Sequence, residues 1–223
     1  MTKTAVLFNS WRLLIAGTLT LLLAATLVSA SARAVGGDDP AQFVHAFGNR
    51  AIAMMADENL AAEQREVTFR RLLTEGFDVP SIGRFALGRY WRKASEEQRA
   101  EYGRLFEDMI VSTYSKLLDS YAGEVLEVGT VRHRDEKKAA VDSRILRAEG
   151  APIQIDWRLR RAGDSWRIVD VLVEGVSMAI IQRSEFHAVV KASGGQIEGL
   201  LAKLREKTGR VESAKLPGTN SML

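Results

Sequence analysis

Apolar and polar residues alternate with a period of two through the middle of the chain. The alternation predicts four strands, over residues 124–134, 139–147, 153–160 and 165–174. The links between these strands are short, and short links require antiparallel neighbours, so we predict a meander sheet. The third strand alternates most regularly and turns four apolar side chains to one face: Ile153, Ile155, Trp157 and Leu159.

The last predicted strand differs from the others because apolar residues occupy both of its faces. In strict alternation one face carries Val169, Val171 and Val173, and the opposite face carries Trp166, Ile168 and Leu172. A strand that is apolar on both faces must be covered on both, either by protein or by a bound ligand.

Spacings of three and four predict helices on both sides of the strand region. They begin at Asp39-Pro40, cover residues 61–73, run from Asp78-Val79-Pro80 to Gly88, and continue from Ser177 to about residue 191 and over residues 196–204. The strongest helix follows a capping box at Ser95-Glu96-Glu97-Gln98 and extends to Tyr121. Helices segregated from an antiparallel sheet define an α+β fold.

The first 34 residues have the pattern of a secretory signal peptide. Lys3 and Arg12 precede an apolar stretch over residues 13–28, and Ala32-Arg33-Ala34 has the form of a cleavage site. An uncleaved anchor is the alternative. We therefore expect export to the periplasm, a single domain over residues 35–208, and a disordered tail over residues 209–223, where periodicity is lost.

Charge and cysteine content narrow the possible functions. The chain has 31 Lys and Arg against 28 Asp and Glu, and residues 1–34 hold three of the basic and none of the acidic residues. The remaining chain is neutral overall, unlike a typical nucleic-acid-binding protein. It has no cysteine, so its stability must come from a packed core, and thiolate metal sites are excluded.

Candidate catalytic and metal-binding residues are few. His45, His133 and His187 are scattered without ligand spacing, so we predict no metal and no cofactor. Ser177 lies in G-V-S-M-A, which misses the G-x-S-x-G elbow of hydrolases at its last position, and capping of the following helix explains it more simply.

Asp170 and Glu174 interrupt the last predicted strand and form the other candidate pair. Spaced by four on a regular strand, their carboxyl groups would lie about 13 Å apart, beyond the separation of a catalytic carboxylate pair. We therefore interpret them as hydrogen-bonded structural carboxylates.

Two sequence blocks resemble a known family. The first is R-F-A-L-G-R-Y-W-R-K-A-S-E-E-Q-R-A-E-Y-G-R-L-F from Arg84 to Phe106, and the second is W-R-I-V-D-V-L-V-E-G-V-S-M from Trp166 to Met178. Together with Arg183, Phe186 and a final G-G-x-I-x-x-L-L, they resemble the MlaC or toluene-tolerance auxiliary family, which has hopanoid-associated HpnM relatives. Ile181-Gln182 before Arg183 departs from the aromatic found there in many members, which leaves the subgroup open.

The resemblance implies a non-enzymatic phospholipid carrier of the periplasm. Such a carrier passes lipid between an outer-membrane lipoprotein complex and an inner-membrane ABC transporter with an MCE-domain subunit. The implied fold is a curved antiparallel sheet of four or slightly more strands, packed against helices and enclosing an apolar cavity. We expect a monomer that binds phospholipid and no nucleic acid.

We predict that the inward apolar residues of the long helix and the sheet contact lipid. They are Met109, Tyr114, Leu117, Ile153, Ile155, Trp157, Val169, Val171 and Val173. Periodicity identifies inward faces but does not separate a cavity wall from ordinary core. Three alternatives stay open: a hopanoid-associated lipid-binding protein of the same fold, an exported serine hydrolase using Ser177, and a lipid-free adaptor whose cavity is filled by side chains.

Overall fold

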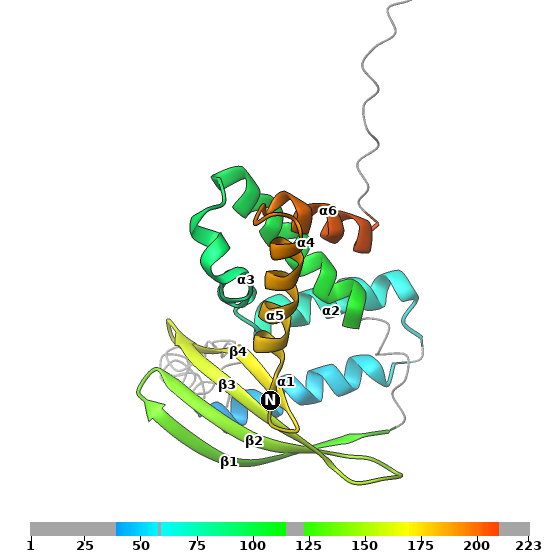
Figure 1. The fold of residues 1–223 in the computed structure, drawn as a ribbon. Helices are drawn as coiled ribbons and strands as arrows, with labels where there is room; N and C mark the ends of the chain where they lie inside the picture. The colour runs from blue at the N-terminus through cyan, green and yellow to red at the C-terminus, as the bar shows by residue number, and fades with distance from the viewer. Residues whose placement is uncertain (1–38, 58, 115–122, 210–223) are drawn as a thin grey trace, which may run out of the picture. The chain divides into compact units, whose positions relative to one another are not determined.

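The computed structural model describes residues 39–57, 59–114 and 123–209 (Figure 1). The elements follow in the order α1 (Pro40–Met55), α2 (Ala62–Gly76), α3 (Val79–Leu87), a 3₁₀ helix η1 (Gly88–Arg92), α4 (Glu96–Tyr114), β1 (Val125–Asp135), β2 (Lys138–Leu146), β3 (Ile153–Ala162), β4 (Ser165–Val173), β5 (Val176–Ser177), α5 (Met178–Ala192) and α6 (Glu198–Lys207). The predicted signal peptide, residues 210–223 of the predicted tail and the predicted helical residues 115–121 lie outside the described residues.

The strands form one curved antiparallel sheet in the order β1-β2-β3-β4-β5, so the predicted α+β meander is confirmed. The fifth strand is a two-residue addition that the sequence analysis did not predict. It follows a tight turn in which Glu174 and Gly175 both have positive φ, 50° and 78°. Two successive residues with positive φ suit the twist of a two-residue hairpin.

Helix starts agree with the caps read from the sequence. The Asp39 carboxylate accepts a hydrogen bond from the Ala41 N–H at 2.9 Å and Pro40 occupies the first turn of α1. At the start of α4, Ser95 Oγ accepts from the Gln98 N–H at 3.2 Å, and Gln98 Oε1 accepts from the Ser95 N–H at 3.1 Å. These reciprocal bonds are the capping box predicted there.

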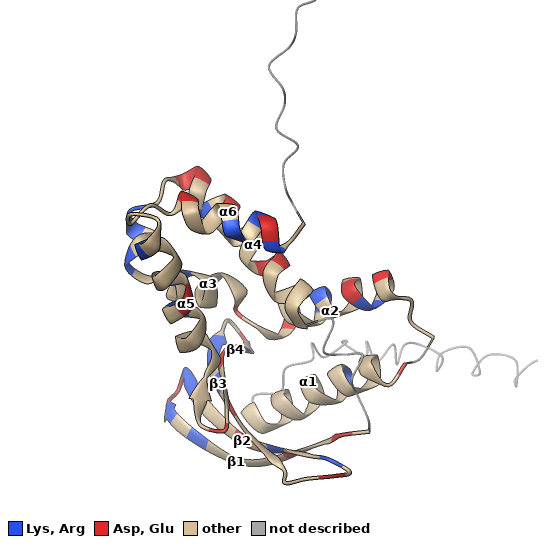
Figure 2. Ribbon diagram, turned by 45° about the vertical axis from the view of Figure 1, so that its right-hand side comes forward, with Lys and Arg blue, Asp and Glu red and all other residues tan. Residues whose placement is uncertain are grey.

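One face of the sheet, here called the inner face, is lined by apolar residues that pair across the strands. Leu159 of β3 pairs with Ala139 of β2 and with Ile168 of β4, and Trp157 pairs with Val141 and Val171. Helix α1 packs against β1 and β2 on this face (Figure 1). It can do so because its sequence has one charged residue, Arg50, in sixteen (Figure 2).

Strand β4 contains a bulge that corrects the two-faced interpretation of this strand. Leu159 pairs with Ile168 but Arg158 pairs with Asp170, so Val169 is an extra residue without a partner on β3. An extra residue reverses the alternation beyond it. Trp166 and Ile168 before the bulge therefore share the inner face with Val171 and Val173 after it.

The same bulge turns Asp170 and Leu172 to the outer face of the sheet. Asp170 pairs there with Arg158, whose Nη1 lies 3.1 Å from Asp170 Oδ2. Four of its apolar residues, Trp166, Ile168, Val171 and Val173, thus lie on one face, and Leu172 stays on the outer face, where it pairs with Ser177 of β5. The prediction that Trp166 and Ile168 face away from Val171 and Val173 is wrong.

Two clusters of buried residues form the core. One lies between α1 and the sheet, and the other lies among α3, η1, α4, α5 and α6. Helix α2 joins them, because Leu72 belongs to the first cluster and Leu73 to the second, while Phe69 and Phe77 touch both.

The helices are attached to the sheet at the bulge. The Asp78 N–H donates to the Ile168 carbonyl at 2.9 Å just before α3 begins. On the other side of the bulge, Asp170 accepts from the Ser177 hydroxyl at 2.7 Å and from the Ala179 N–H at 3.1 Å, which fixes the start of α5. Ser177 Oγ also accepts from the Ile180 N–H at 3.1 Å, so its predicted role as N-cap is confirmed. In the described part of the chain, no helix is long and apolar enough to cross a bilayer.

Gly88 at the end of α3 should resist substitution. Its φ is +57°, and a Cβ added there would lie 2.7 Å from His187 Nε2 on α5. We expect Gly88→Ala to lower the free energy of unfolding by at least about 1–2 kcal/mol, from the left-handed backbone alone. Gly103→Ala is the control, since Gly103 is an exposed position of α4 where an added Cβ meets nothing; we expect it to raise the free energy of unfolding by up to about 1 kcal/mol. Urea denaturation measures both changes, and equal effects would contradict the prediction.

Asp78 should make stability depend on acid pH. Burial raises the pKa of Asp78, but hydrogen bonds from Ser81 and the Arg160 guanidinium outweigh burial and lower it below its ordinary value. A lowered pKa contributes stability above the unfolded pKa of about 3.9, and this stability is lost as pH falls through the folded pKa.

Asp78→Asn keeps a capping oxygen and loses the charge. We expect it to cost roughly 1 kcal/mol at pH 7, the upper range for a partly exposed ion pair. The difference from the unsubstituted protein should shrink as the pH of the urea titration is lowered toward 3. A difference that stays constant over this range would show that the Asp78 charge is not the cause.

Candidate functional site

The inner face of the sheet is covered at one end and partly uncovered at the other. At the covered end Ala139, Val141, Leu159, Trp166 and Ile168 are each at most 3% exposed and belong to the core cluster beneath α1. Toward the opposite end the same face becomes half-buried at Leu126, Ile145, Ile153 and Val173.

Four apolar residues at this second end, here called the open end, belong to neither core cluster: Ile145, Ile153, Ile155 and Val173. They are neighbours, because Ile145 pairs with Ile153 across β2 and β3, and Ile155 pairs with Val173 across β3 and β4. Only Ile155, at the centre of the group, is buried. Val176 of β5 pairs with Val173 at the rim and is 50% exposed.

A polar pair marks the boundary between the two ends. Ser143 is 2% exposed on the inner face, and its Oγ accepts from Trp157 Nε1 at 2.8 Å. The Ser143 hydroxyl lies 3.3 Å from the Ile155 carbonyl, to which it donates. Both side chains therefore satisfy their polar atoms internally and leave the open end lined by hydrocarbon.

The structure brings together five of the nine predicted contact residues. All five lie on the inner face of β3 and β4. They are Ile153, Ile155, Trp157, Val171 and Val173. Val169 is the bulge residue and stands outside this alternation.

The residues predicted from the long helix do not join this group in the described structure. Met109 is 3% exposed within the helical core cluster, so it packs between helices. Tyr114 is the last residue of α4 and is 42% exposed. Leu117 lies outside the described residues.

Several inner-face residues were missed by the sequence analysis. Leu126 and Val128 of β1 share the face with Ile145 of β2, and Ala51 and Met55 of α1 pack toward it. The alternation of Leu126 and Val128 with Glu127 between them was a usable signal. No local signal distinguished Met55 from other apolar residues of its helix.

Ser177 is used to hold the start of α5. It is 7% exposed, its hydroxyl donates to Asp170, and its oxygen accepts from the Ile180 N–H. The Asp170 carboxylate is in turn paired with Arg158 and accepts from the Ala179 N–H, so this group of residues has the bonds of a helix cap. His187 lies further along α5, where Nε2 is 3.3 Å from the Leu87 carbonyl and the ring packs edge-on against Tyr90. Glu174 is likewise structural, because its carboxylate accepts from the Gln154 N–H at 2.7 Å.

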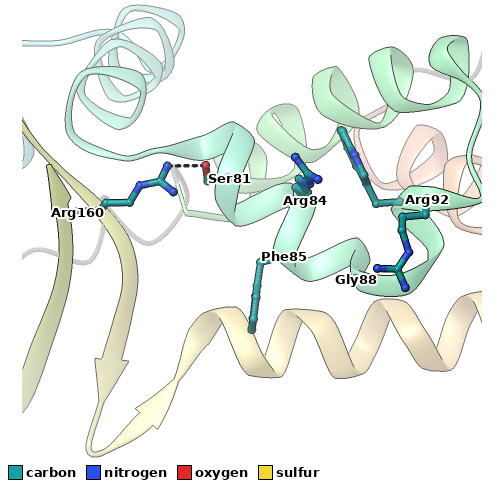
Figure 3. A pocket seen from close by; sticks show the side chains of 7 residues that line it. Ser81, Arg84, Phe85, Gly88, Arg92 and Arg160 are labelled. Atoms are coloured by element: carbon teal, nitrogen blue, oxygen red, sulfur yellow. Dashed lines mark hydrogen bonds between the residues drawn. The ribbon is translucent and has the colours of Figure 1, made fainter. Parts of the chain in front are cut away.

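A separate cavity of about 440 Å³ opens beside α3 and η1 (Figure 3). It is lined by Ser81, Arg84, Phe85, Gly88, Trp91, Arg92 and Arg160. None of the nine predicted contact residues lines it. Its signal in the sequence was the R-F-A-L-G-R-Y-W-R block, which the sequence analysis used only as a family marker.

A curved, unclosed antiparallel sheet with one helix-covered apolar face defines an α+β class that includes a solved structure of similar fold. That structure is a phospholipid-binding protein from Ralstonia solanacearum, solved in complex with a phospholipid. The TM-score is 0.67 at 20% sequence identity, and the match covers 75% of this chain and 95% of the other.

The chain belongs to the MlaC family, whose model, described as MlaC protein, matches residues 45–206. Among relatives, the toluene tolerance protein ttg2D of Pseudomonas putida is 24% identical over 152 residues, which are 68% of this chain and 69% of that protein. The intermembrane phospholipid transport system binding protein MlaC of Haemophilus influenzae is 24% identical over 132 residues, which are 57% of this chain and 61% of that protein. The resemblance read from the two sequence blocks is confirmed.

The two ends of the inner face should differ in their contribution to stability. Leu159→Ala removes a side chain that is 2% exposed in a core cluster, and we expect a loss of about 2–5 kcal/mol in the free energy of unfolding. Ile153→Ala removes a half-buried side chain outside both clusters and should cost less than about 1.5 kcal/mol. Urea denaturation of both variants measures the difference, and equal losses would mean that the open end is packed as core.

Proposed function

We propose that the protein is a periplasmic phospholipid carrier whose open end contacts the acyl chains. The observation that carries the proposal is the group Ile145, Ile153, Ile155 and Val173, which is apolar, faces inward and joins neither core cluster. A hydrocarbon-lined surface of this kind, next to a packed core, suits a ligand with long apolar chains.

The energetics of lipid transfer support a protein carrier. Moving an acyl chain of about 16 carbons through water costs roughly 0.8 kcal/mol per methylene, or on the order of 12 kcal/mol. This cost holds free lipid in its membrane, so transfer requires an apolar surface that travels with the lipid. Membership of the MlaC family and the phospholipid held by the Ralstonia protein of similar fold support the same ligand class.

Within this proposal residues 1–34 direct export, residues 35–208 bind lipid, and the protein works as a monomer without a catalytic step. It would carry lipid between an outer-membrane lipoprotein complex and an inner-membrane ABC transporter with an MCE-domain subunit. The Haemophilus relative is named an intermembrane phospholipid transport system binding protein, which supports this assignment.

Lipid extraction and mass spectrometry of the purified protein test the proposal. We expect phospholipid in about stoichiometric amount, and uptake of phospholipid from vesicles after its removal. A hopanoid in the extract would favour the hopanoid-associated alternative. Repeated absence of any lipid, together with no uptake, would favour the lipid-free adaptor and contradict the proposal.

Matched substitutions localise the lipid. Val173→Asn places an amide at the open end, and we expect the co-purified lipid to fall several-fold because burying an unpaired amide against acyl chains costs about 1–3 kcal/mol. Val125→Asn is the control, since Val125 lies on the outer face of β1 and is already 55% exposed. The lipid-to-protein ratio by mass spectrometry is the readout, with circular dichroism to verify folding. Equal lipid content in both variants would place the acyl chains elsewhere.

A further inference from the structure

The cavity beside α3 and η1 collects positive charge. Arg84 from α3, Arg92 from η1 and Arg160 from β3 all contribute to its lining, and no carboxylate does (Figure 3). Arg160 is held in place by its ion pair with Asp78 and its hydrogen bond to Ser81 Oγ at 2.8 Å. For Arg84 and Arg92, no ion pair with a carboxylate is found among residues 39–57, 59–114 and 123–209.

The wall of the cavity holds the Arg84 guanidinium without neutralising it. The Arg84 guanidinium carbon lies 5.8 Å from the centre of the Trp91 ring, and Arg99 approaches the same ring at 5.7 Å. Cation–π contact restrains an arginine and leaves its N–H groups free to bind an anion. Arg160 is compensated by Asp78, but Arg84 and Arg92 leave positive charge beside the hollow, and an anion bound there would neutralise it.

Apolar groups form one side of the cavity. Phe85 lines it, is 42% exposed, and points toward α5 (Figure 3). The Arg183 guanidinium carbon lies 5.0 Å from the Phe85 ring centre. The volume of about 440 Å³ and this apolar wall suit an anionic group attached to an organic body.

We propose that this cavity is a binding site for the phosphate group of a phosphate ester. Guanidinium groups match phosphate oxygens in pairs of parallel hydrogen bonds, which makes arginine the preferred residue for phosphate recognition. The arginines of the lining offer more N–H groups than the two oxygens of a carboxylate would use, and a phosphate ester has more oxygens to share among them.

The cavity is separate from the proposed acyl-chain surface. Arg160 is adjacent to Leu159 on β3, and because Leu159 faces inward, Arg160 projects from the outer face. The phosphate therefore has two possible sources, a soluble phosphate ester or the headgroup of a phospholipid in a membrane surface. The site itself does not depend on the proposed carrier function.

Titration of the protein as purified tests the site. Inorganic phosphate and glycerol 3-phosphate are the soluble probes, followed by the arginine Nε–Hε signals in nuclear magnetic resonance spectra at constant ionic strength. Vesicles of phosphatidylglycerol are the lipid probe, followed by co-sedimentation. The variants are Arg84→Gln, Arg92→Gln and their combination, with Arg104→Gln, at an exposed position of α4, as the matched control.

We expect saturable binding by the unsubstituted protein and the Arg104 control, and a loss of affinity of about tenfold for each cavity variant. A loss confined to the soluble probes identifies a soluble ester as the ligand, and a loss for vesicles identifies a headgroup; both results support the site. Binding that does not saturate, that survives in the double variant, or that falls equally with Arg104→Gln overturns the proposal. Lipid content measured by extraction is a separate readout, so failure of this site leaves the carrier proposal intact.

Discussion

The arrangement of this molecule depends on the one extra residue in β4. Because Val169 has no partner on β3, the strand changes face between Ile168 and Asp170. The backbone carbonyl before the bulge binds the start of α3, and the carboxylate after it binds the start of α5. A regular strand would turn Asp170 to the inner face, where its charge would lie in hydrocarbon at a large desolvation cost.

Attachment at this edge determines how the sheet is covered. Helices α3, α4, α5 and α6 pack together into a core of their own. Helix α1 covers the inner face next to β1 and β2. α1 approaches closely because Gly48 lies under Leu126, whose Cδ2 would be 2.1 Å from an added Cβ. Among the described residues, the core cluster between α1, α2 and the sheet does not include Ile145, Ile153 and Val173, which are half-buried. An incomplete cover is a disadvantage for a structural core and a requirement for a surface that must take up and release an apolar ligand.

The two faces of β3 carry different chemistry. From Ile153 to Leu159 its inward residues are apolar and lead to the open end, while Arg160 on the outward side reaches the cavity of α3 and η1. A phospholipid also combines an apolar part with a charged phosphate, which demand opposite surroundings. Over residues 153–160, period-two alternation lets the strand present both surroundings without placing a charge in the apolar face.

The sequence by itself determined the family, the α+β class, the meander and the helix caps at Asp39, Ser95 and Ser177. These features rest on local patterns: alternation, short links, and side chains that bond backbone groups within three residues. The bulge, the separation of Met109 from the sheet and the convergence of Arg84 with Arg160 were decided only by the tertiary structure. A bulge exists only relative to a partner strand, and whether an inward residue is core or open surface depends on what covers it. Neither relation is present in a single stretch of sequence.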